Sequence, residues 1–195
     1  MKKQRTTEWV ENIDIDYHIR QFETPYQSTI KFCNFLEKNG KLGGRKSSEL
    51  ILDAGSGSGG NIKYMGEQFA NQYIGVDLNN ELVELGNDYF LTHGLEHKLM
   101  QGDLFNLSAL VKQPVEGIIS FQTLSWLPDY KAAINSMASL QPNWIAASSP
   151  FEINIELAPP SDKGLGSYTR DFASGEKAQF TGPLMLPWYF IVASK

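Results

Sequence analysis

The chain has 195 residues, of which 42% are hydrophobic and 20% are charged, and its formal net charge is -5. This length corresponds to about one domain, and the composition excludes a disordered or fibrous chain. The acidic balance argues against a protein that holds nucleic acid through a broadly basic surface. The single cysteine, Cys33, excludes an internal disulfide framework, so we expect a reducing, cytoplasmic setting.

The first helical pattern follows Pro25. Apolar side chains recur at helical spacing as far as Leu36, and the pair Asn39-Gly40 ends the predicted helix. The preceding stretch, up to about residue 22, mixes charged and aromatic side chains without a clear period. Residues 43–48 have the composition of a loop.

From residue 50 onwards, short apolar runs alternate with helical segments. Asn79 is placed to cap one of the helices. This alternation predicts right-handed crossovers and a mostly parallel, doubly wound Rossmann-like α/β sheet covered on both faces. The predicted strands are residues 50–52, 72–76, 98–100, 115–121 and 144–147, and the predicted helices are 62–70, 79–91 and 130–140.

Beyond Pro150 the pattern changes to two strand-like segments, residues 151–157 and 184–194, which predict a C-terminal antiparallel hairpin. The junction at Ser149-Pro150 is too short for a parallel strand to reverse into an antiparallel partner. We therefore expect either that no substrate lid exists here or, preferably, that a stretch of sequence is missing at this junction.

The most informative part of the sequence is the glycine-rich segment 52–60. It reads Leu-Asp-Ala-Gly-Ser-Gly-Ser-Gly-Gly. A strand that runs into close glycines and then a helix predicts a nucleotide site, because the bare backbone can approach the ligand. Its spacing also fits the dinucleotide fingerprint. However, Asp53 precedes the first glycine, Gly55, by two residues. Its carboxylate would oppose a pyrophosphate and suits a ligand with an amine.

Two more carboxylates follow the next two predicted strands. Asp77 is placed to accept hydrogen bonds from ribose hydroxyls, and Asp103 to accept one from the exocyclic amine of a purine. Together with Asp53 they lie at the carboxyl ends of consecutive strands, where open parallel sheets bind ligands.

This set of residues resembles the class I S-adenosylmethionine-dependent methyltransferases over about residues 49–147. Residues 117–122 look like the fourth strand of that family and the segment bordering the methyl group. The resemblance implies S-adenosylmethionine as cofactor, a cofactor-binding domain over 49–195 and an N-terminal helical cap over 1–48. The residues it implies at the cofactor are Asp53, Gly55, Ser56, Gly57, Gly59, Asp77, Leu78, Asp103, Leu104 and Phe121, with Tyr17 and Arg20 from the cap.

The segment after the fourth strand departs from one branch of that family. Phe121-Gln122-Thr123-Leu124 stands where amino-methyltransferases of nucleobases and glutamine carry two prolines and an aromatic residue. We therefore expect a small-molecule acceptor. The alternatives are an RNA or protein methyltransferase and a non-catalytic methyltransferase-like binding subunit, while Asp53 disfavours an NAD-dependent dehydrogenase.

No catalytic residue is identified, because methyl transfer needs a base only when the acceptor must first lose a proton. His18 could act as a base, but a lone histidine is interpreted here as a surface residue. No metal site is expected, since His93 and His97 have no third ligand. Three aromatic residues could line a pocket, but we prefer to interpret them as part of the hydrophobic core: Trp126, Trp188 and Tyr189. The chain shows no targeting segment, and its longest apolar run, residues 186–193, is far below the ~20 residues of a membrane span.

Overall fold

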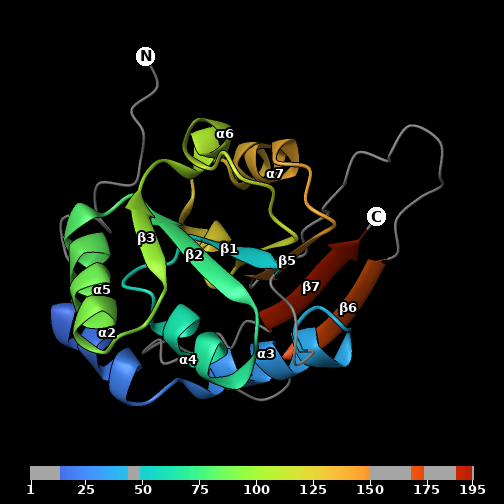
Figure 1. Cartoon of the computed structure of the whole chain (residues 1–195). Helices are drawn as coiled ribbons and strands as arrows, with labels where there is room; N and C mark the ends of the chain where they lie inside the picture. Colours follow the sequence, from blue (N-terminus) through green and yellow to red (C-terminus); the bar gives the residue numbers. More distant parts are fainter. Residues whose placement is uncertain (1–13, 44–48, 150–167, 174–187, 195) are drawn as a thin grey trace, which may run out of the picture.

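A twisted sheet of seven strands forms the centre of the molecule (Figure 1). The computed structural model describes residues 14–43, 49–149, 168–173 and 188–194. Within them the strand order is β3-β2-β1-β4-β5-β7-β6. The strands are β1 (Leu50–Ala54), β2 (Gln72–Asp77), β3 (Lys98–Gln101), β4 (Gly117–Ser120), β5 (Trp144–Ser149), β6 (Tyr168–Ala173) and β7 (Trp188–Ser194).

The first five strands are parallel, and β7 is antiparallel to both of its neighbours, β5 and β6. This arrangement confirms the predicted Rossmann-like sheet with a C-terminal antiparallel pair. The strand expected at residues 151–157 lies outside the described residues, and β6 occupies a segment for which no strand was expected. Because residues 150–167 separate β5 from β6, the chain is long enough for a parallel crossover. The expectation of missing sequence after Ser149 depends on residues outside the described structure and stays a prediction.

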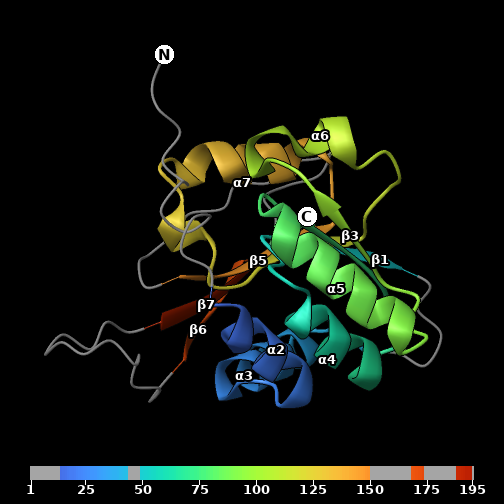
Figure 2. The ribbon, with the colours of Figure 1, turned by 90° about the vertical axis from the view of Figure 1, so that its left-hand side faces the viewer.

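Helices cover both faces of the sheet (Figures 1 and 2). The sheet is therefore a middle layer between two helical layers. The first layer is α2 (Ile15–Glu23), α3 (Gln27–Lys38), α4 (Gly60–Gln68) and α5 (Asn80–Thr92). The second is η1 (Leu104–Asn106), α6 (Leu107–Leu110), η2 (Leu124–Trp126) and α7 (Tyr130–Ser139).

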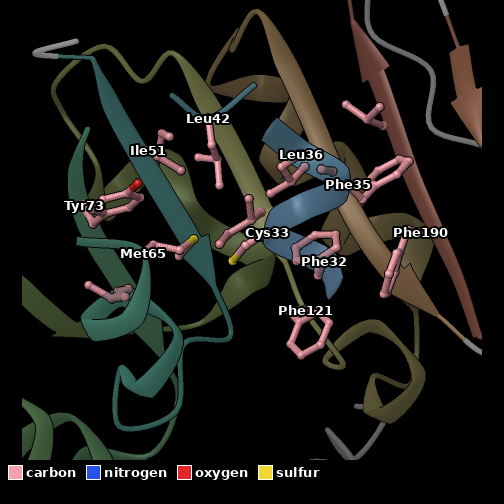
Figure 3. Close-up of a cluster of buried hydrophobic side chains, with 14 of the residues drawn as sticks. Phe32, Cys33, Phe35, Leu36, Leu42, Ile51, Met65, Tyr73, Phe121 and Phe190 are labelled. Atoms are coloured by element: carbon pink, nitrogen blue, oxygen red, sulfur yellow. The ribbon is translucent and has the colours of Figure 1, made fainter. Parts of the chain in front are cut away.

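Helix α3 seals the core on the first face (Figure 3). Its Phe32 stacks on Phe121 with 4.9 Å between ring centroids and lies 5.3 Å from the ring of Phe190 on β7. Four apolar side chains of this helix are almost fully buried, namely Phe32, Cys33, Phe35 and Leu36. Residues 27–38 therefore share one hydrophobic core with the sheet, and this packing fixes α3 against the sheet.

Side-chain caps begin several helices. Asn79 accepts a hydrogen bond from the backbone N–H of Leu82 at 3.1 Å, which confirms its predicted capping role at α5. Asp14 accepts from Tyr17 N–H at 3.0 Å and begins α2, a helix that the sequence pattern did not predict. None of the described helices is long and apolar enough to cross a membrane.

Candidate functional site

The loop between β1 and α4 adopts a backbone that requires glycine. Gly55, Gly57 and Gly59 have φ angles of +88°, +54° and +83°, in the left-handed region that residues with a Cβ rarely adopt. A Cβ added to Gly55 would also collide with the side chain of Thr123. The glycines are thus needed both for backbone conformation and for space, and they leave the loop backbone bare.

The neighbouring strand β2 holds this loop in place. The backbone N–H groups of Gly55 and Ser56 donate to the carbonyl oxygen of Val76, at 2.8 and 3.2 Å. Gly57 N–H donates to Oδ2 of Asp77 at 2.7 Å, and Asn79 N–H donates to its Oδ1 at 2.9 Å. Asp77 therefore anchors the glycine loop, in addition to its predicted contact with a ribose.

The three predicted carboxylates stand at the carboxyl ends of β1, β2 and β3, which are adjacent in the sheet. Asp53 is aligned with Gly75 on β2, and Asp77 is aligned with Gln101 on β3. Asp103 caps η1 by accepting from Phe105 N–H at 2.9 Å. The fold places these groups along one edge of the sheet, as expected for a ligand site in an open parallel sheet.

Asp53 is the most unusual of the three. Its side chain is 1% exposed, and neither carboxylate oxygen has a hydrogen-bond partner. Burial, together with the charge of nearby Asp77, raises the pKa of Asp53 to about 8. A buried carboxyl group without partners is costly. The site is therefore suited to a ligand that brings a positively charged hydrogen-bond donor.

The segment after β4 closes a second side of the loop. The hydroxyl of Thr123 lies 3.1 Å from the carbonyl oxygen of Gly55, and Gln122 N–H donates to the hydroxyl of Ser148 at 2.9 Å. Gln122 has a φ of +57°, a strained conformation for a residue with a side chain. These bonds fix the segment beside the glycines, and the sequence analysis did not identify them.

Helix α2 covers the third side. His18 is buried, with its Nδ1 3.4 Å from the hydroxyl of Ser58 and its ring beside Gly57. Burial lowers its pKa to about 4, so the ring is neutral at physiological pH. Gln21, one turn further along, packs on Gly60 at the start of α4. The interpretation of His18 as a surface residue was wrong, because α2 turns it onto the glycine loop.

The other two predicted residues of α2 lie further out. Tyr17 is half-buried and stacks on Tyr26 with 5.3 Å between ring centroids, and burial raises the pKa of its hydroxyl. Arg20 is exposed, and its guanidinium lies 3.7 Å from the carboxylate of Asp14. Contact of either residue with a ligand stays a prediction.

The remaining predicted cofactor residues divide by burial. Leu78 is 37% exposed at the end of β2, whereas Ser56 is buried in the loop with its hydroxyl unpartnered. Leu104 and Phe121 are buried in the two hydrophobic clusters on opposite faces of the sheet. Of these four residues, only Leu78 presents its side chain to the outside.

Gly86 in α5 is a residue of the site that the sequence analysis missed. A Cβ at this position would meet the backbone carbonyl oxygen of Ser58. The helix thus packs directly onto the glycine loop, with no side chain between them. A glycine inside the predicted helix 79–91 was the sequence feature that could have revealed this approach, since glycine there is costly for helix formation.

Several other side chains lie away from the loop. His97 packs edge-on to Tyr73 and Phe90, and His93 stacks on Tyr89. In the described part of the chain, no three His, Cys, Asp or Glu side chains gather to hold a metal ion. Trp126 is 47% exposed, which corrects its interpretation as core. The side chains of Trp188 and Tyr189 lie outside the described structure.

Comparisons with known proteins find one matching family model and solved structures with the same fold. Residues 51–142 match the family model of a methyltransferase domain. No sequence among curated proteins matches the chain. A SAM-dependent methyltransferase from Aquifex aeolicus is 12% identical with a TM-score of 0.61, over 93% of this chain and 98% of that one.

Two further solved structures share the fold. Magnesium protoporphyrin IX methyltransferase from Synechocystis PCC 6803, with bound SAM, is 17% identical with a TM-score of 0.61, over 94% of this chain and 85% of that one. A structure from Galdieria sulphuraria, described as a sarcosine dimethylglycine methyltransferase, is 16% identical with a TM-score of 0.56 over 63% of this chain. The chain spans 45% of the length of the Galdieria protein.

Proposed function

Since the chain carries a class I S-adenosylmethionine-dependent methyltransferase domain, we propose that it transfers a methyl group from S-adenosylmethionine to a small-molecule acceptor. The observation that carries this proposal is the carboxyl group of Asp53, buried without a partner beneath a loop of left-handed glycines. An amino acid's ammonium would pair with the ionised carboxylate there, whereas a pyrophosphate would find no such partner.

The residues of the acidic edge fit the parts of this cofactor. In our proposal Asp53 faces the ammonium, Asp77 the ribose hydroxyls, and Asp103 the adenine, with Leu78 and Leu104 flanking that ring. Gly55, Ser56, Gly57 and Gly59 supply the bare backbone beside the amino acid part. When bound, the cofactor supplies an electrophilic methyl group on a sulfonium.

The chain's own residues then act by orientation and exclusion of water, which dominate in an in-line displacement. Thr123 and Ser148 fix the segment after β4, and His18 holds α2 against the glycine loop. We place the acceptor between α2 and residues 121–128, with Tyr17 and Arg20 at its edge. His18 is neutral and could accept a proton, but its ring lies against Ser58. We therefore assign it to holding α2 over the glycine loop and not to proton transfer.

A small acceptor is favoured over a macromolecule by four observations. Residues 121–124 lack the two prolines of amino-methyltransferases, and the net charge of -5 disfavours an RNA surface. Two of the solved structures with this fold bear the names of small-molecule methyltransferases. The loop from residue 121 to 128 also carries no charged side chain that would bind a phosphate backbone.

Calorimetric titration tests the cofactor assignment directly. We expect S-adenosylhomocysteine to bind with a micromolar dissociation constant and NAD to give no heat, because an ammonium gains an ion pair with the ionised carboxylate of Asp53, whereas a pyrophosphate gains none. The acceptor is then identified by incubating the protein with radiolabelled S-adenosylmethionine and a library of metabolites, and by measuring which metabolite becomes labelled. Tight binding of NAD, or failure of S-adenosylhomocysteine to bind, contradicts the proposal.

The role of α2 as a cover is tested by two neighbouring substitutions. His18→Ala should weaken S-adenosylhomocysteine about tenfold, because it removes the contacts of α2 with Ser58 and Gly57, and about 1.4 kcal/mol corresponds to that factor. Ile19→Ala is the control, since Ile19 is 40% exposed. The measurement is calorimetry of both variants at pH 7. Equal affinities for the two variants would show that α2 is not part of the cofactor site.

A further inference from the structure

Among the described residues, the titratable groups found to interact with Asp53 are acids. The titratable groups that interact with it are Cys33 on α3 and Asp77 on β2. Cys33 interacts in turn with Tyr64 on α4 and Tyr73 on β2. The adjacent strand β4, Gly-Ile-Ile-Ser, has no titratable side chain. Each of these neighbours is a neutral or negatively charged acid, so none of them stabilises a carboxylate at Asp53.

The groups that approach from α2 do not supply a charge either. His18 reaches the glycine loop, but burial holds its pKa near 4, so it is uncharged at neutral pH. Arg20 is exposed and lies beside Asp14. The two oxygens of Asp53 thus have neither a cation nor a hydrogen-bond donor from the described residues. In the free protein the neutral carboxylic acid is the more stable form.

We propose that Asp53 holds a proton in the free protein and releases it to solvent when the cofactor's ammonium binds. This inference rests on the proposed function, because it requires a ligand with an ammonium at this position. The O–H bond of the carboxylic acid breaks and the proton passes to the buffer. The carboxylate that remains pairs with the ammonium, which keeps its own three protons, and no covalent bond to the cofactor forms. Asp53 is a ligand-binding residue whose charge state changes with occupancy.

The direction of the pH dependence follows from this scheme. Bound ligand favours the ionised form, so protons compete with the ligand below the pKa of the free protein. With that pKa at about 8, binding at pH 7 should release about 0.9 proton, and affinity should rise almost tenfold from pH 6 to pH 7. The rise should level off as the pH approaches 8, because the free protein is then already partly ionised.

Calorimetry in two buffers of different ionisation enthalpy, phosphate and Tris, measures the released protons at pH 7. S-adenosylhomocysteine should show a heat that depends on the buffer and gives close to one proton released. 5′-Methylthioadenosine has the same adenosine but no ammonium, so it should bind without proton release. Asp53→Asn should abolish the release with S-adenosylhomocysteine, whereas Asp103→Asn should retain it.

The outcomes separate this inference from the proposed function. If S-adenosylhomocysteine binds with a buffer-independent heat and a pH-independent affinity, the proton release is refuted and the cofactor assignment stands. If S-adenosylhomocysteine does not bind at all, both fail. Should Asp53→Asn not fold, the comparison of the two ligands on the unmodified protein still decides, because equal proton release with both would place the proton elsewhere.

Discussion

Replacing Gly86 with alanine should destabilise the fold and weaken cofactor binding together. The new Cβ would meet the carbonyl oxygen of Ser58 and a methyl group of Leu99. The first of these is backbone, so α5 and the glycine loop must move apart. Overpacking of this kind costs about 1–3 kcal/mol, which exceeds the gain of up to about 1 kcal/mol in helix propensity. Denaturant unfolding measures the first effect, and titration with S-adenosylhomocysteine measures the second.

Gly66→Ala is the matched control for this change. Gly66 also lies inside a helix, α4, and a Cβ there would meet the imidazole of His97. That ring is the tip of a half-buried side chain and can rotate away, so the substitution should leave cofactor affinity unchanged and cost little stability. If Gly86→Ala has the same free energy of unfolding and the same affinity for S-adenosylhomocysteine as Gly66→Ala, the direct packing of α5 on the loop has no functional importance.

The central sheet could be predicted because its evidence is local. Each of β1 to β5 is a short apolar run next to a turn or loop, and the buried parallel strand is the structure in which such a run is stable. The acidic edge followed from the same pattern, since a residue that ends a parallel strand must lie at the ligand-binding side of the sheet. Asp53, Asp77 and Asp103 were therefore placed correctly along the edge without any knowledge of contacts.

Helix α2 was missed although its sequence has apolar side chains at helical spacing, Ile15, Ile19 and Phe22. The burial of His18 does not follow from that pattern, because it depends on which face of the helix packs against the rest of the fold. The helix is stabilised by its contact with the start of α4, a contact between segments about forty residues apart. Strand β6 has the same problem, because Tyr-Thr-Arg-Asp-Phe-Ala is neither an apolar run nor a clear alternation.

A second feature that the sequence analysis missed is that the glycine-rich loop between β1 and α4 is held in place by residues from other parts of the chain. Thr123, in the segment after β4, and Gly86, on α5, both contact the glycine-rich loop. Neither contact follows from the spacing of the glycines themselves. The glycine pattern indicates where a ligand approaches the backbone. Which groups hold that backbone in position depends on the packing of the whole sheet.

Asp77→Ala should cause the largest loss of cofactor affinity, because the carboxylate has two roles. In the structure its oxygens accept from Gly57 N–H at 2.7 Å and Asn79 N–H at 2.9 Å, so it anchors the loop. In our proposal its remaining lone pairs accept the ribose hydroxyls. Hydrogen bonds to a charged group contribute roughly 1.5–3 kcal/mol, so loss of the ribose contact alone corresponds to about ten- to a hundredfold. Release of Gly57 should add to this.

Two further variants separate these roles in the same titration with S-adenosylhomocysteine. Asp77→Asn keeps one acceptor oxygen and can anchor one of the two N–H groups, while its amide nitrogen faces the other. We therefore expect an affinity between those of Asp77→Ala and the unmodified protein. Asp88→Ala removes an equal charge from the exposed side of α5 and should leave binding unchanged, which shows that the losses at Asp77 are not an effect of net charge. Undiminished affinity in Asp77→Ala would mean that the carboxylate serves neither the ribose nor the glycine loop.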